Sequence, residues 1–561
     1  MDHPQGNTTT PVEVEARILT RPAVERHRPS RATWVWIGVA GAAGVATGAG
    51  FAPLGWWVAT VLGVSGLSLA TRRTRSHCHA AAAGLMFGLG LTIPTLSWMS
   101  VIHLGAALGL VLAVSAGYTV LGVLLHVAGR SRWWPLLGAG AWLVVEFIAA
   151  RFPFGGFGWL RLGYAMVDSP LAGLLPLVGV AGVSLATSLT GNLITLFIEV
   201  RSRRSLAVVA AWAAVLGAAI IVGYALPLPP ATSAASVGWV QGGAPGGGVY
   251  GLGAARRITT NQTRATLDLA ADIASGREPV PDFVVWPESS TDLDPDSDPQ
   301  TRDLIESALK SIQRPILVGA ILNGPGTGQR RTASRWTQPD GRVGPTYIKR
   351  SIVPFGEWIP YRDVLLPLIP ELRYVGAQSV AGTEPGMLEV KLPDGTPVTL
   401  GALACFDVAF DPVTYDLAEA QLLIVQSNNA MYQGTIQIEQ QFAITRARAA
   451  ELRREILVVT TSGVSGLIDP YGQVVNRDAG PTAATGVVDL PLRTGTTPAS
   501  RTAEPLELVI TLLAATWLAT LALASLRRQR PARFDSPADS GKPQPAGVPE
   551  MIHFQVAESD Q

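Results

Sequence analysis

The sequence predicts a polytopic α-helical membrane domain of about eight spans, with an α/β domain inserted before the last span. Three observations predict this fold class. Hydrophobic residues make up 48% of the 561 residues and charged residues only 15%, a composition typical of membrane proteins. Apolar segments of membrane-spanning length fill the N-terminal part of the chain. Strand-like and helix-like segments then alternate, as in an α/β sheet domain.

The N-terminal part divides into a polar tail and a membrane domain. Residues 1–32 are rich in Arg and lack the apolar core and small-residue cleavage site of a signal peptide, so we expect a disordered cytoplasmic tail. Residues 33–227 are apolar and rich in Gly and Ala, which suits close helix packing in lipid. We expect seven membrane helices, near 34–51, 55–71, 80–101, 105–128, 133–150, 170–199 and 205–226.

Arginine clusters predict the orientation of the spans. They lie in the N-terminal tail, at Arg72–Arg75, at Arg130 and Arg132, and at Arg201–Arg204. These loops alternate along the chain, so we place all of them in the cytoplasm. Seven spans then put residues 228–500 on the outer face of the membrane.

The C-terminal part contains an eighth apolar segment and a second tail. The segment covers 505–527 and ends in the basic run RRQRPAR, which predicts a return of the chain to the cytoplasm. Residues 528–561 read as a second disordered cytoplasmic tail.

Residues 228–500 form the predicted α/β domain. Helical stretches are expected at 253–275, 299–312 and 435–454. Buried strands are expected at Val237–Gln241, Phe283–Trp286, Pro315–Leu322, Leu422–Gln426 and Ile456–Thr460. The net charge of +1 gives no nucleic-acid footprint, so we expect no nucleic-acid partner.

The distribution of cysteine and histidine restricts the chemistry of this domain. The chain has two cysteines, Cys78 and Cys405, and no CxxC spacing typical of a metal site. None of the seven histidines lies between Thr232 and Pro505. A Cys-His or Ser-His mechanism is therefore excluded within the domain, and a reactive thiol there needs a carboxylate as its base.

Three short patterns carry candidate chemistry, and each follows a strand-like run. FVVWPES carries Glu288, YIKRSIVPFGEW carries Lys349 and Glu357, and ACFD carries Cys405. Each has a structural alternative when taken alone, because a lone Cys is usually a packed core residue and an acid after a strand often forms a salt bridge or a helix cap. Their order within a domain without histidine favours a catalytic site.

In this order the three patterns resemble the nitrilase superfamily, with its Glu-Lys-Cys triad in a four-layer αββα sandwich. LLIVQSNNAMY, RARAAELRR and ILVVTTSGVSGLIDPYG also fit. With the polytopic part before the sandwich, one span after it, and WLVVEFIAARFPFGGFGWLRLGY within the membrane part, the chain resembles the apolipoprotein N-acyltransferase family. The resemblance covers roughly 35–525 and implies a nitrilase-like αββα sandwich for the inserted domain.

The resemblance implies roles for individual residues. Glu288 matches the general base, Lys349 the oxyanion stabiliser and Cys405 the nucleophile. The backbone N–H of Phe406 is expected to complete the oxyanion hole together with Lys349. Glu357 matches a further acid, which we expect to hold Lys349 or Glu288 in position.

The sequence departs from the family pattern at two places. Family members often carry Tyr-Glu after the cysteine, whereas this chain carries Phe406-Asp407, so the phenol is lost and the acid is shortened. The first strand of the domain also runs into a glycine-rich GGAPGGGVYG, where an aromatic residue would help to bind lipid. Trp239 or Tyr250 could replace that residue.

The reaction implied by the resemblance is a ping-pong acyl transfer. Cys405 takes an acyl chain from a phospholipid as a thioester, and the free amine of a lipoprotein's diacylglyceryl-cysteine then accepts it. The expected partners are a phospholipid acyl donor, a diacylated apolipoprotein and the bilayer, with the chain acting as a monomer in the bacterial cytoplasmic membrane. No cofactor or metal is expected, since no P-loop or Rossmann glycine pattern is present.

Two other functions compete with acyl transfer. A membrane-tethered nitrilase-type amidase would use the same triad with water as the acceptor. A transporter with an outer regulatory domain would bury charged pairs within its spans, where chiefly Glu146 is found.

One segment of the α/β domain is unusually apolar. Trp358–Val375 reads WIPYRDVLLPLIPELRYV and combines aromatic, Leu and Ile residues with prolines. Two interpretations stay open: the segment packs in the core of the domain, or it forms an exposed arm that dips into the membrane surface.

Overall fold

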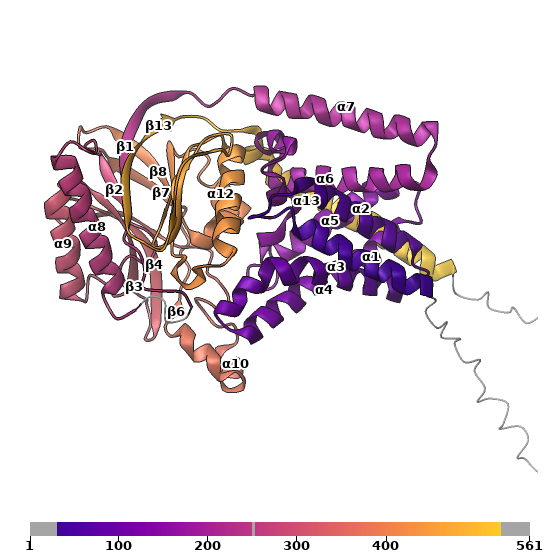
Figure 1. The fold of residues 1–561 in the computed structure, drawn as a ribbon, viewed down its shortest axis with the longest axis horizontal. Coiled ribbons are helices and arrows are strands. Elements are labelled where there is room, and N and C mark those ends of the chain that lie inside the picture. Colours follow the sequence, from indigo (N-terminus) through magenta and orange to yellow (C-terminus); the bar gives the residue numbers. More distant parts are fainter. Residues whose placement is uncertain (1–30, 249–252, 529–561) are drawn as a thin grey trace, which may run out of the picture.

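A computed structural model of the chain describes residues 31–248 and 253–528. The predicted tails, 1–32 and 528–561, lie almost wholly outside the described residues, as does Tyr250. Within the described part, a bundle of helices stands beside a sandwich of two β-sheets (Figure 1).

Helices lie close to all eight predicted membrane segments. They are α1 (Arg31–Gly48), α2 (Trp57–Arg73), α3 (His77–Leu96), α4 (Leu104–Ala128), α5 (Trp134–Ala149), α6 (Leu175–Val200), α7 (Arg203–Ala225) and, after the sandwich, α13 (Pro498–Arg528). Five helical segments of the described part are long and apolar enough to cross a membrane, namely those containing α3, α4, α6, α7 and α13. The helices α1, α2 and α5 have only 18, 17 and 16 residues. A membrane protein is therefore supported, and the count of eight spans stays a prediction.

Glycine brings some of these helices into backbone contact. A Cβ atom on Gly84 of α3 would lie 2.2 Å from the carbonyl oxygen of Tyr118 on α4, and one on Gly122 would meet the carbonyl oxygen of Ala80 at 2.3 Å. Any larger side chain at these positions would force α3 and α4 apart, as expected for small residues at helix interfaces in lipid. By contrast, α7 stands at the edge of the bundle, beside α6 (Figure 1).

The inserted domain contains two sheets of mixed strand direction. The first has the strand order β13-β1-β2-β3-β4-β5, with β6 paired to β4, and the second has the order β12-β11-β10-β9-β8-β7. Parallel pairs form between β1, β2 and β3 in the first sheet and between β8, β9 and β10 in the second. The strands are β1 (Ala231–Gln241), β2 (Phe283–Val285), β3 (Ile316–Asn323), β4 (Gln329–Thr337), β5 (Val343–Ile348), β6 (Gln378–Ser379), β7 (Met387–Lys391), β8 (Pro397–Ala404), β9 (Leu422–Ser427), β10 (Ile456–Thr460), β11 (Gly463–Ile468), β12 (Val474–Gly480) and β13 (Ala484–Arg493).

Helices cover both outer faces of the paired sheets. On one side, α8 (Arg257–Ala274) and α9 (Pro299–Ile312) pack on β1, β2 and β3 through a core that includes Leu269, Leu309 and Trp286. A second core fills the space between the sheets. On the other side, α12 (Gln437–Leu452) packs on the second sheet (Figure 1). The order helix, sheet, sheet, helix is that of the expected αββα sandwich.

The helix α12 also faces the membrane part of the chain. Its Phe442, Ile444 and Ala447 belong to one hydrophobic core that contains Val425 of β9 and, from the helical bundle, Leu175 of α6. The sandwich and the bundle therefore share a core through α12.

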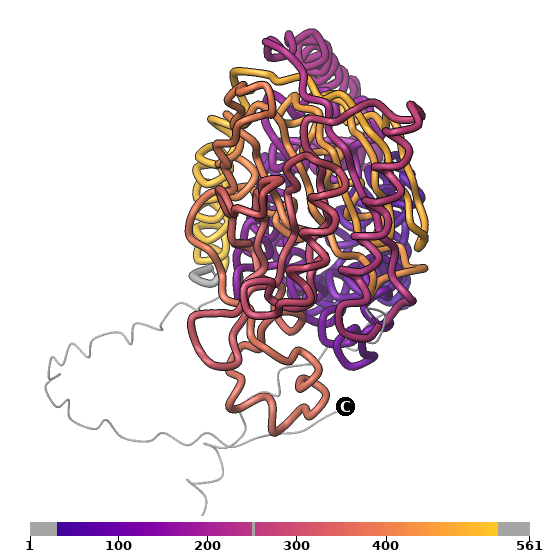
Figure 2. The backbone as a smooth tube through the Cα atoms, turned by 90° about the vertical axis from the view of Figure 1, so that its left-hand side faces the viewer, coloured from indigo at the N-terminus to yellow at the C-terminus, as the bar shows by residue number. Residues whose placement is uncertain are grey.

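The apolar segment Trp358–Val375 extends away from the sandwich. It contains α10 (Arg362–Leu368) and the 3-10 helix η7 (Pro370–Val375), neither of which has a buried side chain. Figures 1 and 2 both show this segment projecting from the body of the molecule. The interpretation that these helices pack in the core is therefore wrong, and the exposed arm stays a prediction.

Candidate active site

The three residues predicted for a triad lie at or just beyond the ends of three strands. Glu288 follows β2, Lys349 follows β5 directly, and Cys405 follows β8 directly. Strands β2 and β5 belong to the first sheet and β8 to the second, so the residues come together across the sandwich. Active residues are commonly presented at such strand ends.

Lys349 holds two carboxylates in a buried cluster. Its Nζ donates to Glu288 Oε1 at 2.8 Å and to the two oxygens of Glu357 at 3.1 and 3.0 Å. Lys349 and Glu288 are 3% and 5% exposed. Backbone N–H groups hold the carboxylates as well, that of Asn428 at Glu288 Oε2 and that of Val353 at Glu357 Oε2. The structure therefore joins Glu357 to Lys349 directly.

The electrostatics of this cluster favour an ionised lysine beside a strong base. Burial opposes the charge of Lys349, but Glu288 and Glu357 outweigh it and keep the pKa of the ammonium well above its ordinary value. Burial raises the pKa of Glu288, and Glu357 raises it further against the attraction of Lys349. A carboxylate with a raised pKa accepts a proton more readily near neutral pH.

Cys405 sits on a strained turn next to this cluster. Its φ of +50° lies in the left-handed region, which non-glycine residues rarely adopt. The side chain is half-buried, and Sγ lies 3.9 Å from Gln441 Oε1. Burial and then Glu288 raise the pKa of the Cys405 thiol, while Lys349 lowers it. The resting thiol is therefore protonated, and its reactivity depends on a neighbouring base.

Asp407 fixes the turn that carries the cysteine. Its Oδ2 accepts the hydroxyl of Tyr347 at 2.8 Å and the N–H of Ala404 at 3.0 Å, and its Oδ1 accepts the N–H of Ser351 at 2.9 Å. The side chain is fully buried. Asp407 thus ties the turn of Cys405 to β5 and to the segment after Lys349.

Phe406 turns its ring toward the membrane part of the chain. The ring lies 6.0 Å from that of Phe157 and 5.9 Å from that of Trp159, both between α5 and α6. The ring of Trp159 also contacts that of Trp98, and the ring of Trp98 meets that of Tyr432 edge-on, with 5.3 Å between the ring centroids. Aromatic side chains from the bundle and the sandwich therefore adjoin the turn of Cys405.

Three polar residues around the site could have been found in the sequence. Tyr347 precedes Lys349 by two residues, and the two-residue period of a strand puts both on one face. Gln437 and Gln441 recur at i and i+4, which puts both on one face of α12. Gln441 Oε1 accepts from Asn429 Nδ2 at 2.9 Å as well as lying near Cys405.

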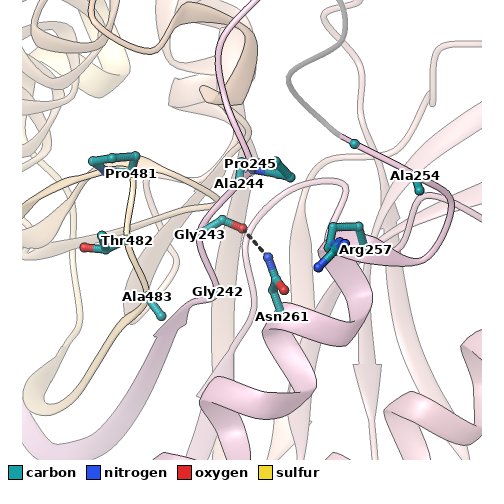
Figure 3. Close-up of a pocket in the computed structure, with 11 residues that line it drawn as sticks. Gly242, Gly243, Ala244, Pro245, Ala254, Arg257, Asn261, Pro481, Thr482 and Ala483 are labelled. Atoms are coloured by element: carbon teal, nitrogen blue, oxygen red, sulfur yellow. Dashed lines mark hydrogen bonds between the residues drawn. The ribbon is translucent and has the colours of Figure 1, made fainter.

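The glycine-rich loop after β1 borders a cavity of about 480 Å³ (Figure 3). Arg257 and Asn261 of α8 line it, and Asn261 Nδ2 donates to the carbonyl oxygen of Gly243. The loop adjoins the site, because Gly243 N–H donates to Thr461 O and Thr461 Oγ1 donates to the carbonyl oxygen of Glu288. Trp239, one of the two aromatic residues considered above for lipid binding, is 7% exposed and packs between the sheets.

The described part of the chain offers no evident metal site. No group of three or more His, Cys, Asp or Glu side chains in 31–248 and 253–528 has an arrangement that could hold a metal ion.

Comparison with known proteins covers both parts of the chain. Residues 43–193 match the family described as apolipoprotein N-acyltransferase N-terminal domain, and residues 262–497 match the carbon-nitrogen hydrolase family. The second match agrees with the nitrilase-like sandwich. Among solved structures, an amidase from Nesterenkonia sp. is 20% identical, with a TM-score of 0.33 over 49% of this chain and 95% of the amidase, a likeness too loose to support an inference.

Curated relatives match over most of the chain. An apolipoprotein N-acyltransferase of Mycolicibacterium smegmatis is 31% identical over 514 residues, covering 87% of this chain and 84% of the relative. Those of Nitrosomonas europaea and Pseudomonas aeruginosa are 29% and 28% identical and cover 78% and 80% of this chain and 87% and 88% of their own lengths. This chain therefore belongs to the apolipoprotein N-acyltransferase family.

Proposed function

We propose that this chain transfers an acyl group from a phospholipid to the N-terminal amine of a diacylated lipoprotein, through a thioester at Cys405. The observation that carries this proposal is the buried Glu288–Lys349–Glu357 cluster beside a thiol, at the junction between the sandwich and the apolar helices. Both substrates are lipids, which accounts for a thiol site built against a membrane domain.

In the first half-reaction, Cys405 attacks the ester carbonyl of the phospholipid while Glu288 takes the thiol proton. Negative charge develops on the carbonyl oxygen, and the Lys349 ammonium and the backbone N–H of Phe406 stabilise it. The C–O bond then breaks, and Glu288 returns the proton to the departing lysophospholipid. The acyl chain is left on Sγ as a thioester.

In the second half-reaction, the lipoprotein's free α-amine attacks the thioester. Glu288 accepts a proton from the amine, the C–S bond breaks as the amide forms, and Glu288 returns that proton to Sγ, which restores the thiol. Glu357 keeps Lys349 oriented through both steps by its two contacts with Nζ. Asp407 keeps the turn of the nucleophile in place.

Mass spectrometry of the Cys405 peptide tests this chemistry. Purified protein incubated with phospholipid alone gains one acyl mass at Cys405 and releases one equivalent of lysophospholipid, and a diacylated lipopeptide then removes the acyl group. Cys405→Ala gives neither product, whereas Cys78→Ser, which changes the exposed cysteine of α3, reacts normally. Transfer at a normal rate by Cys405→Ala would refute the assignment.

The amidase alternative differs only in the acceptor. It is not favoured, because the named relatives span both the membrane part and the sandwich. The same assay separates the two functions, since an amidase discharges the thioester to water without needing the lipopeptide amine.

The proposed location is the bacterial cytoplasmic membrane, with both termini in the cytoplasm, the sandwich on the outer face and the chain a monomer. The alternating arginine loops support this orientation. Single cysteines placed in the C-terminal tail of a variant without Cys78 and Cys405 test it with an impermeant thiol reagent. External labelling of that tail contradicts the eight-span topology.

A further inference from the structure

The segment that follows the nucleophile is held from both sides by buried arginines. Arg448 of α12 donates from Nε to the carbonyl oxygen of Val408 at 2.8 Å and from Nη2 to Asp411 Oδ1 at 2.6 Å. Arg161 donates from Nη1 to the other oxygen, Asp411 Oδ2, at 2.6 Å. Asp411 therefore bridges two arginines, six residues beyond Cys405.

Arg161 belongs to the membrane part of the chain. It lies between α5 and α6, and its Nη2 donates at 2.7 Å to Glu507 of α13, the helix after the sandwich. Nearby, Tyr164 accepts from Arg448 Nη2 at 2.8 Å and donates to the carbonyl oxygen of Ala409 at 3.5 Å. Two polar side chains of the membrane part, Arg161 and Tyr164, therefore contact the residues that follow Cys405.

The four charged side chains that join Asp411 to α12 and α13 are withdrawn from water. Arg161, Arg448, Asp411 and Glu507 are between 0% and 5% exposed. Burial alone would raise the pKa of Asp411, but Arg161 and Arg448 hold it below its ordinary value, so the carboxylate stays ionised. Losing one such contact leaves a buried charge with fewer partners, which costs more than breaking a surface pair.

We propose that Arg161, Asp411 and Arg448 are positioning residues, through which the membrane domain holds the turn of Cys405 in its reactive geometry. This inference rests on the proposed thioester function. A non-glycine residue at positive φ keeps that conformation only where its surroundings impose it. Asp407 holds the turn at Cys405 itself, and the arginine network holds the residues that follow the turn, Val408 to Asp411.

Arginine suits this role better than lysine. The guanidinium of Arg161 reaches Asp411 and Glu507 with separate nitrogens, whereas a single ammonium cannot reproduce that fork. Arg161→Lys therefore keeps the buried charge and loses part of the geometry. Asp411→Asn keeps the shape and loses the charge that both arginines share.

The chain offers a matched control. Arg446 of α12 also binds the membrane part, through Asp168 at 2.6 Å, but Asp168 is 46% exposed in its side chain and neither residue touches the turn. Asp168→Asn thus breaks an interdomain ion pair without freeing the nucleophile's segment.

The test measures single-turnover thioester formation in the full-length protein, in a Cys78→Ser background. We expect Arg161→Lys and Asp411→Asn to lower the acylation rate at saturating phospholipid by about 10²-fold, as small misplacements of reacting groups do, with the half-saturating concentration unchanged. Asp168→Asn should react at the parent rate. Parent-rate acylation by either network variant overturns the proposal, whereas failure of the parent itself to form a thioester refutes the proposed function instead.

A second readout separates positioning from a general loss of stability. With Cys78 removed, iodoacetamide reports on Cys405 alone, and its rate is followed against pH in the folded, monodisperse fraction of each variant. Burial and Glu288 raise the pKa of the thiol in the parent, so a relaxed turn should move the profile down toward the roughly 8.5 of an ordinary cysteine. An unchanged profile in both network variants shows that the network only stabilises the fold, and overturns the proposal.

Discussion

Glu357→Gln should shift the pH–rate profile of thioester formation, so that the rate lost on acidification is lost at a lower pH. Lys349 Nζ lies 2.8 Å from Glu288 Oε1 and 3.0 Å from Glu357 Oε2, so these two oxygens are at most about 6 Å apart. At an effective dielectric constant of about 20, two unit charges at that separation interact by about 3 kcal/mol, or about 2 pH units. Glutamine keeps the size and an acceptor for Val353 N–H, and removes that charge.

The sign follows from the protonation state that the reaction needs. Glu288 must be ionised to accept the thiol proton, so activity is lost as the pH falls through its pKa, which burial and Glu357 raise. Without Glu357 the pKa of Glu288 falls, and the limb shifts to lower pH by 1–2 units, a range that allows for screening by Lys349. The plateau rate falls too, because Glu288 becomes a weaker base.

Quenched-flow measurement of lysophospholipid release between about pH 4 and 8 follows this acidic limb of the profile. Glu371→Gln is the control, because it removes the same charge from the projecting arm instead of from the Lys349 cluster. A limb that stays in place or moves to higher pH would show that Glu357 does not act electrostatically on Glu288, and would refute the reasoning.

Three further changes test other parts of the site. Lys349→Arg keeps the charge but replaces a compact ammonium by a planar fork, so acylation should fall almost as far as in Lys349→Ala, by single-turnover assay. Tyr347→Phe removes the hydroxyl that donates to Asp407 and should lower the free energy of unfolding by about 1.5–3 kcal/mol. Denaturant titration measures this change, and an unchanged midpoint would contradict the prediction. Replacing the exposed Val364 and Leu368 of α10 by Ser should slow turnover of vesicle phospholipid without lowering thermal stability, and equal turnover argues against a membrane-dipping arm.

The sequence was enough to predict where most helices and strands lie and which candidate site residues follow the strands. Apolar length located the helices, and buried β-rich runs located β2, β3, β9 and β10 almost to the residue, whereas β1 begins six residues before the expected Val237. The sequence also predicted that Glu288, Lys349 and Cys405 each follow a strand, but not that strands of two different sheets bring them together.

The contacts between the two parts of the chain could not be predicted in the same way. Arg161 and Arg448 look like ordinary loop and helix cations, since their partner Asp411 lies 250 and 37 residues away in sequence. Only the folded arrangement of α12 against the bundle shows that they share one carboxylate. The two interpretations of Trp358–Val375 were equally undecided, because composition does not distinguish a buried apolar segment from an exposed one.

The core shared through α12 means that the domain boundaries are not folding boundaries. Phe442 and Ile444 pack against apolar side chains of both parts, so a truncated protein of residues 228–500 would expose this surface to water and would lose Arg161, one of the two arginines that pair with Asp411. Such a fragment would aggregate rather than stay soluble. We therefore expect the two parts to fold together, so that production of residues 228–500 requires the helices that accompany them.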